Sequence, residues 1–363
     1  MALTLTEEQL DFKSAVDDVL DSAGDTKRVR EVQEAGAPFD DKLWKALVEL
    51  GVPGILVSED HDGLGLGLSE ASIVLQALGA HISPTPYRGL AIATAVIAKS
   101  GDGALADEVL PKIADGSLLV VPAFAEGNGG WIPAAPSVTV SGGAVSGTKS
   151  FVLDGVAAQA FLVLATEGGT QGLYYVEAGD GVEVTKLDTL DRSTSAASVA
   201  FANAPARKVA TADFGELLAY ADAVASTVIA ANLYGGFAKT LEIAVQYAKD
   251  RFQFGRPIGS FQGVKFPLAE LAMEDELALS ILRQATTAAD EDPEDFVVAG
   301  LTALSKLQGI ALEGAIRLVQ TLGGIGFTWD HDAHLYQKQA ATVRLVLGTP
   351  AERSERLAQA LGI

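Results

Sequence analysis

The chain has 363 residues, of which 48% are hydrophobic and none is cysteine, and its formal net charge is −21. This length and apolar content are sufficient for two or three domains with buried cores. The lack of cysteine excludes disulfides, thiolate metal sites and thiol nucleophiles, and the acidic balance argues against a nucleic-acid partner, because a phosphate backbone requires clusters of Lys and Arg.

The N-terminal third is predicted to be helical. Thr6 has N-cap chemistry, and Phe12, Val16 and Val19 recur at helical spacing, so the first helix is expected over residues 6–22. Four shorter helices are expected over residues 40–50, 69–78, 88–99 and 104–114. The start of the chain is acidic where a signal peptide is basic, and the apolar runs are short. We therefore expect a cytoplasmic protein without a membrane span.

The middle third changes to the two-residue period of β-strands. Short β-rich segments, separated by Gly, Asp and Asn, cover residues 118–124, 138–140, 160–165, 172–176, 182–186 and 197–201. Segments of this length and spacing predict a small antiparallel barrel or sandwich.

The last third is helical again. Long helices are expected from Glu216 to about Arg251, from Phe261 to Ala288 and from Pro293 to Leu322, and two short ones within residues 333–347 and 351–361. The simplest arrangement of these helices is an up-down four-helix bundle.

Residues 251–271, between the first two long helices, carry the most informative pattern. Gly255 ends the preceding helix. Arg251 supplies a planar guanidinium, Gln253 and Gln262 supply amides, and three Phe residues supply flat apolar surface. These groups are suited to holding phosphates beside an aromatic base. On these residues alone, a capped helix corner with a surface arginine stays an alternative.

This stretch resembles the R-x-x-F-G-x-x-I-x-x-F-Q signature of flavin-dependent acyl-CoA dehydrogenases. All six named positions match, at Arg251, Phe254, Gly255, Ile258, Phe261 and Gln262. In that family these residues lie at a subunit interface and hold the ADP half of an FAD whose flavin ring sits in the neighbouring subunit. The resemblance therefore implies that Arg251, Gln253, Phe254 and Gln262 bind FAD.

A second stretch, Val319–Phe327, is similar to the family's Q-x-x-G-G-x-G-F motif. An ordinary glycine helix cap explains an isolated instance equally well. Beside the first motif, the resemblance implies a cofactor-binding role for Gln320, Gly323 and Gly324, and for Thr349 in a later Leu-Gly-Thr string.

The order of helical, β and helical regions is also similar to that of acyl-CoA dehydrogenases, so the resemblance covers nearly the whole chain. It implies an α+β fold with an N-terminal helical domain (residues 1–117), a middle β-barrel or sandwich (118–214) and a C-terminal four-helix bundle (215–363). The Gly-rich loop Gly51–Glu70 is similar to a loop of the family, with Ser58 in place of the usual Pro.

The residues that do the chemistry in that family are absent. Most members use the Glu of an E-G-T string as the base, and Leu347 stands there; others use a Glu on the long helix, where Ala225 stands. Neither side chain can accept a proton. Asp222, one turn before Ala225, could replace the base, as could Asp330 or Asp332, but each is more simply a solvated charge near a helix end.

Contacts to the flavin ring are also lost. By resemblance, Phe151 replaces a Trp, Leu153 replaces a hydrogen-bonding Thr, and Ala125 replaces the Thr of a T-E-P loop in which Glu126 is kept. A flavin ring needs hydrogen-bond donors, and an apolar strand offers only packing. The histidines of the string Asp330–Tyr336 have a spacing that a metal could use, but the string resembles a structural turn of related proteins, so no metal site is expected.

The residues that hold the ADP half are kept, and those that serve the flavin ring and the proton are lost. This pattern predicts a non-catalytic subunit. It would complete the FAD site of a second acyl-CoA dehydrogenase subunit, which carries the catalytic Glu, in an α2β2 enzyme that introduces an α,β double bond into an acyl-CoA thioester. Such enzymes are similar to actinobacterial ones that act on bulky steroid side chains, and the PTPY string at 84–87 favours that comparison. An electron-transfer flavoprotein is one acceptor that this prediction leaves open.

Two alternatives stay open. One is a homotetrameric dehydrogenase with a relocated base, or a flavin oxidase or monooxygenase, for which loss of the Glu is no defect. The other is a scaffold protein that has lost FAD.

Overall fold

The structure is a computed structural model that describes residues 4–23, 26–127, 130–291 and 293–363. The N-terminal part is helical, with α1 (Glu7–Ala23), α2 (Thr26–Ala35), α3 (Asp41–Glu49), α4 (Leu68–Ala80), α5 (Tyr87–Ser100) and α6 (Gly103–Ala114). The first predicted helix is confirmed within one residue at each end. α2 was not predicted, because it is highly charged and buries only Val29 and Val32, too few for a clear apolar period.

The middle part is one curled sheet. Its strands are β1 (Val120–Ala123), β2 (Thr139–Ser141), β3 (Ala144–Leu153), β4 (Ala160–Glu167), β5 (Thr170–Glu177), β6 (Val182–Lys186), β7 (Ala196–Pro205) and β8 (Arg207–Lys208). Their order is β6-β7-β3-β2-β4-β5-β8, and β1 also pairs with β4. The expected antiparallel pairing is wrong for two pairs, because β1 and β2 both run parallel to β4. Alternation along a strand defines its faces but not the direction of its partner.

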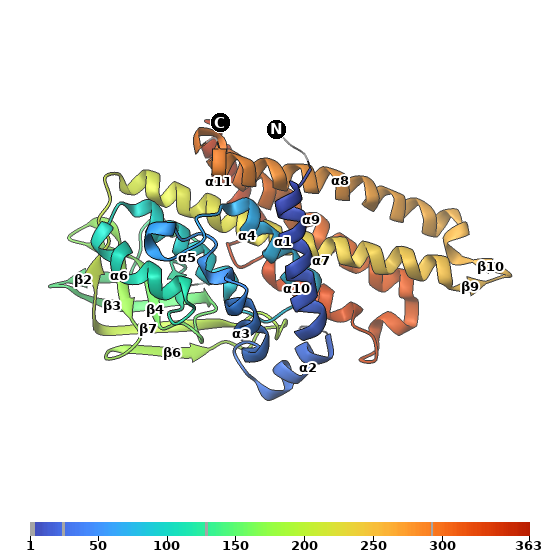
Figure 1. The fold of residues 1–363 in the computed structure, drawn as a ribbon, viewed down its shortest axis with the longest axis horizontal. Coiled ribbons are helices and arrows are strands. Elements are labelled where there is room, and N and C mark those ends of the chain that lie inside the picture. Colours follow the sequence, from blue (N-terminus) through green and yellow to red (C-terminus); the bar gives the residue numbers. More distant parts are fainter. Residues whose placement is uncertain (1–3, 24–25, 128–129, 292) are drawn as a thin grey trace.

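The C-terminal part is a helix bundle. Its helices are α7 (Phe214–Asp250), α8 (Gln262–Glu291), α9 (Pro293–Leu322), α10 (Ala333–Val343) and α11 (Pro350–Ala360). The three long helices run side by side, α10 packs on α7 and α9, and α11 packs on α9 (Figure 1). The predicted helical bundle is therefore confirmed, and its third long helix has the predicted ends.

Two apolar cores hold the chain together. One is continuous from the N-terminal helices into α7, α8 and α9. The other lies within the sheet and includes Val121, Phe161, Val199 and Phe201. Because both helical regions share one core, the boundaries after residues 117 and 214 stay predictions.

Helix α7 forms the centre of the helical core. It is apolar on nearly every side and buries residues along most of its length. By length and composition two helices of the described residues could cross a membrane, but 83% of the most apolar window in α7 is buried inside the protein. This burial is typical of a core helix.

The crossing of α4 and α7 depends on glycine. A Cβ at Gly235 would lie 1.8 Å from the carbonyl oxygen of Gln76, and one at Gly79 would lie 2.0 Å from that of Asn232. The two backbones therefore approach too closely for any side chain at these positions.

We expect Gly235→Ala to destabilise the fold by about 1–3 kcal/mol, because the added methyl group must push the two helices apart. The shift of the urea unfolding midpoint measures this loss. Gly309→Ala in α9 is the matched control, since a Cβ there meets no atom within 4 Å. An equal loss in both variants would contradict the proposed close approach.

Candidate functional site

A short hairpin extends from the end of the bundle between α7 and α8 (Figure 1). It consists of β9 (Phe252–Gln253) and β10 (Arg256–Pro257). Phe254 and Gly255 at its tip both have positive φ, 53° and 79°, as a two-residue type I′ turn requires. The Phe254 side chain is 92% exposed. A positive φ is unfavourable for a residue with a β-carbon, and a large aromatic ring is rarely left in solvent. Together they indicate a contact surface at the tip of the hairpin.

The hairpin also presents hydrogen-bond donors. Arg251 caps the end of α7 with its backbone, and its exposed guanidinium has no hydrogen-bond or ion-pair partner among the described residues. Gln262 opens α8 and is exposed as well. Arg256 lies over the ring of Phe261, 4.0 Å from its centroid. Free donors beside aromatic faces fit a phosphate next to an aromatic base.

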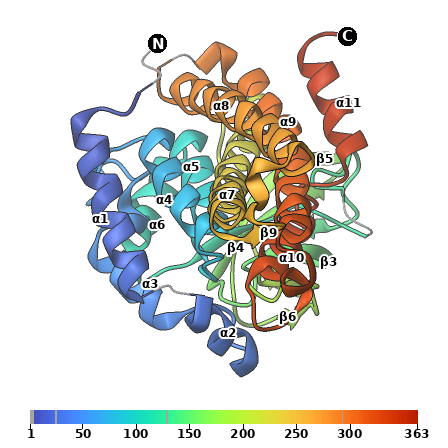
Figure 2. The same ribbon diagram turned by 90° about the vertical axis from the view of Figure 1, so that its right-hand side faces the viewer.

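The end of α9 lies at the same end of the bundle, because α8 runs back between α7 and α9. Figure 2 views the molecule from this end, with β9 and α9 near its centre. Gln320, Gly323 and Gly324 are exposed there. A Cβ at either glycine would meet no atom within 4 Å, so their backbone is open to approach from outside.

Thr349 does not join this group. It is the N-cap of α11, and its hydroxyl donates to the Glu352 carboxylate at 2.9 Å and accepts from the Glu352 backbone N–H. Figures 1 and 2 both place α11 away from the hairpin. A cofactor role for Thr349 therefore stays a prediction.

The two positions where a base was sought are buried. Leu347 is 1% exposed and Ala225 is fully buried, so apolar side chains fill the interior at both places. Of the acidic alternatives, Asp330 is exposed and Asp332 pairs with Arg30 at 2.7 Å.

The expectation that Asp222 is a solvated charge is wrong. Its side chain is 9% exposed and pairs with Arg356 of α11 at 3.4 Å. Burial raises the pKa of the Asp222 carboxyl, while Arg356 and Arg353 oppose that shift. Neither arginine was predicted to be buried, because a buried and a surface arginine look alike in the sequence of a short charged helix.

The strand expected beside a flavin ring offers few donors. Phe151 on β3 has a positive φ of 52° and is 47% exposed, whereas Leu153 and Ala125 are buried. Glu126, the retained residue of the upstream loop, is occupied internally, since it accepts from Ser137 and from the buried Lys149. Burial lowers the pKa of Lys149 to about 8. Glu126 and Lys149 therefore connect the loop to the sheet, and they are not available as hydrogen-bond donors to a flavin ring.

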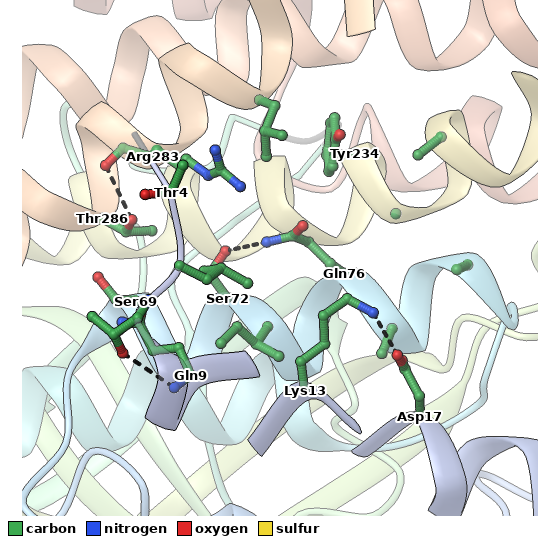
Figure 3. A pocket seen from close by; sticks show the side chains of 18 of the residues that line it. Thr4, Gln9, Lys13, Asp17, Ser69, Ser72, Gln76, Tyr234, Arg283 and Thr286 are labelled. Atoms are coloured by element: carbon green, nitrogen blue, oxygen red, sulfur yellow. Dashed lines mark hydrogen bonds and ion pairs between the residues drawn. The ribbon is translucent and has the colours of Figure 1, made fainter. Parts of the chain in front are cut away.

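A cavity of about 450 Å³ lies elsewhere, between α1, α4, α7 and α8. Figure 3 shows Lys13 and Asp17 of α1 on one side of it and Tyr234 of α7 on another. Lys13 pairs with Asp17, and Lys239 pairs with Glu242 at 2.9 Å. None of the predicted site residues lines this cavity.

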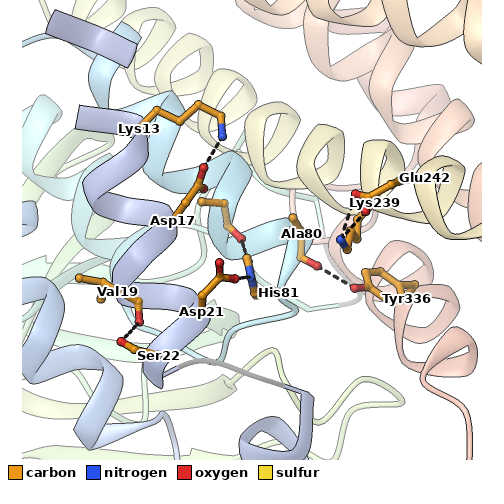
Figure 4. Close-up of polar contacts among 11 residues, drawn as sticks. Lys13, Asp17, Val19, Asp21, Ser22, Ala80, His81, Lys239, Glu242 and Tyr336 are labelled. Carbon is orange, nitrogen blue, oxygen red and sulfur yellow. Dashed lines mark hydrogen bonds and ion pairs between the residues drawn. The ribbon is translucent and has the colours of Figure 1, made fainter. Parts of the chain in front are cut away.

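Polar contacts near the cavity connect neighbouring helices (Figure 4). His81, the C-cap of α4, contacts Asp21 of α1 at 3.3 Å, and the Tyr336 hydroxyl of α10 donates to the carbonyl oxygen of Ala80 at 2.7 Å. Among the described residues no group of three His, Asp or Glu side chains could hold a metal ion. In the predicted turn, His331 accepts from the backbone of Ala333.

Comparison with known proteins decides the family. The family model of the acyl-CoA dehydrogenase N-terminal domain matches residues 6–117, and that of the C-terminal domain matches residues 223–362. The chain belongs to the acyl-CoA dehydrogenase family. The predicted family and its fold, with helical ends and a curled middle sheet, are thereby confirmed. Members of this family are FAD-dependent oxidoreductases.

Two curated relatives match nearly end to end. Acyl-CoA dehydrogenase IpdE2 of Mycolicibacterium smegmatis is 28% identical over 97% of this chain and 98% of its own length. Acyl-CoA dehydrogenase FadE27 of Mycobacterium tuberculosis is 29% identical over 99% of each chain.

Two solved acyl-CoA dehydrogenase structures are similar over the whole chain. One is a variant of the Tcur3481-Tcur3483 steroid ACAD, at 31% identity and a TM-score of 0.90 over 99% of each chain. The other is the ChsE4-ChsE5 complex of Mycobacterium tuberculosis, at 27% identity and a TM-score of 0.88, over 100% of this chain and 99% of the other. Both names pair two different polypeptides, which supports the predicted similarity to heteromeric members of the family.

Proposed function

We propose that this chain is the non-catalytic subunit of a heteromeric acyl-CoA dehydrogenase. It binds the ADP half of an FAD, and a second acyl-CoA dehydrogenase subunit supplies the flavin-ring site, the acyl pocket and the catalytic Glu. Together the two chains would form an α2β2 enzyme that introduces an α,β double bond into an acyl-CoA thioester. Cytoplasmic location and electron transfer to an electron-transfer flavoprotein belong to the same proposal.

The observation that carries this proposal is the outward-facing group on the hairpin and the end of α9. Arg251, Gln262 and Gln320 present exposed side chains, and Phe254 is 92% exposed. A guanidinium without a partner and a solvent-exposed aromatic ring become useful when a second polypeptide brings a nucleotide against them. FAD supplies redox chemistry when bound; these residues would only hold and orient its ADP half.

The interior of the chain argues against a catalytic role. A base must reach the α-proton of a bound thioester, but Leu347 and Ala225 are apolar and buried. Asp222 faces two arginines in the interior. We therefore interpret Asp222 and Arg356 as a structural ion pair.

The proposed acyl group is supported by the comparisons. One similar structure is of a steroid ACAD, so we propose a bulky, steroid-type acyl-CoA as the substrate of the complex. The rival function, a homomeric flavoenzyme with a relocated base, would require Asp222 to leave its arginine partners.

The visible spectrum of the purified chain tests the proposal. Produced alone, the chain is expected to be colourless, because it lacks a donor set for the flavin ring. Produced with a companion acyl-CoA dehydrogenase subunit that has the Glu, it is expected to yield a yellow complex with flavin absorbance. A yellow, active product from this chain alone would overturn the proposal.

A further inference from the structure

Unpaired polar atoms gather in the interior beneath α11. Arg353 is 1% exposed, and one amino group of its guanidinium donates to the Oε1 atom of Gln308 on α9. Its Nε and Nη1 atoms have no hydrogen-bond partner among the described residues. Arg356, one turn later, donates to the carbonyl oxygen of Leu347 at 3.1 Å, but its Nε also lacks a hydrogen bond of normal geometry.

Neighbouring elements add to this group. Buried atoms without a hydrogen-bond partner also occur on Arg344 (Nε) and Ser226 (Oγ). Arg344 and Arg356 both lower the pKa of Arg353, and a hydrogen bond from Trp131 lowers the pKa of the Asp222 carboxyl, so these side chains lie close together. Ser226 follows Asp222 by one turn of α7 and shares its face.

Most of these orphan atoms are donors. Each buried donor without an acceptor costs about 1–3 kcal/mol, and more when it is charged. Such groups are rare in folded proteins, where another protein group, a water or an ion usually bonds to them. Among the described residues, the guanidinium donors of Arg353 and Arg344 therefore lack acceptors.

The charge of the cluster points to an anion. Arg353 has two guanidinium neighbours, of Arg344 and Arg356, and two carboxylate neighbours, of Asp222 and Glu352. The Glu352 carboxylate is already used by the cap at Thr349. Burial lowers the pKa of Arg353 to about 10, and its cationic neighbours act in the same direction. A buried surplus of positive charge is stabilised by a counter-charge that accepts several hydrogen bonds.

We propose that the chain binds a small oxyanion, a carboxylate or a phosphate, between α7, α9 and α11, with Arg353 as its main ligand. Planar guanidinium groups match the two oxygens of either group. Arg356 keeps 19% of its side chain exposed and so connects the site to solvent. The site lies within this one chain and does not depend on the FAD-completing role proposed above.

Thermal melting in matched salts tests the site. The chain, or its complex with the companion subunit, is compared in potassium phosphate, acetate and chloride at equal ionic strength and pH. We expect the melting temperature to rise saturably with phosphate or acetate relative to chloride, and the more effective salt identifies the anion. Bound ligand stabilises the folded state by mass action. Neither FAD content nor turnover enters this measurement, so its outcome is separate from that of the proposed function.

Two variants and a control make the test specific. Arg353→Met should abolish the rise, and Arg344→Gln, at a partly exposed position, should weaken it several-fold if Arg353→Met does not fold. Arg317→Met removes an equal charge from the surface of α9, where Arg317 pairs with Glu313, and should leave the rise unchanged. The proposal is overturned if neither oxyanion raises the melting temperature of the wild-type protein, or if every variant responds as the wild type does.

Discussion

Replacement of Arg251 by alanine is expected to strip most of the FAD from the purified heteromeric complex. The guanidinium is exposed and has no partner among the described residues, so its removal leaves the fold of this chain intact. Charge-assisted hydrogen bonds of this kind contribute about 1.5–3 kcal/mol, which corresponds to roughly a 10- to 150-fold weaker binding of FAD. The ratio of flavin to protein absorbance after gel filtration measures the loss.

Lys249→Ala is the matched control for Arg251→Ala. Lys249 has the same charge, lies two residues earlier in the last turn of α7 and is also exposed. It should keep its FAD because a long-range charge effect is screened in physiological salt. Equal FAD content in Arg251→Ala and wild type would refute the cofactor role of the hairpin.

Replacement of Asp222 by alanine is expected to destabilise the fold and to leave the chemistry unchanged. Removing the carboxylate leaves Arg356 and Arg353 without their buried counter-charge, and breaking a buried ion pair in this way costs about 3–5 kcal/mol. Urea unfolding of the complex measures the loss. Turnover per folded complex should equal that of the wild type, because we assign the base to the companion subunit.

Two further variants separate the structural from the catalytic role of Asp222. Asp330→Ala removes an exposed carboxylate and should change stability little. The double variant Asp222→Leu/Arg356→Met removes both members of the pair and should recover much of the lost stability, since an apolar pair of similar volume often replaces a buried ion pair at little cost. Loss of turnover in stable, folded Asp222→Ala complex would instead make Asp222 the base.

These expectations share one structural cause. The groups that would contact a nucleotide lie at an exposed end of the bundle. The positions that would contact a thioester are buried among other side chains. Asp222 lies within α7, inside the core, whereas Arg251 is the C-cap just beyond the exposed end of that helix. Substitution by alanine is therefore expected to weaken FAD binding at position 251 and to destabilise the fold at position 222.

The family motif pointed to the exposed junction between α7 and α8. The resemblance implied that Arg251, Phe254 and Gln262 bind FAD, and all three lie at one exposed helix junction, because neighbours in such a short stretch of sequence are neighbours in space. Their cofactor role stays a prediction. The type I′ turn at Phe254 was not predicted, since an aromatic residue with positive φ contradicts local preference.

The sequence by itself determined the family, the order of helical and β regions, and the absence of Glu at both usual base positions, because these follow from side-chain identity and local periodicity. Only the tertiary structure decided that β1 and β2 run parallel to β4, that Gly235 must stay small, and that Asp222 is buried against arginines of α11. Each of these depends on contacts between segments far apart in the chain. Burial and pairing are properties of those contacts, and no local pattern carries them.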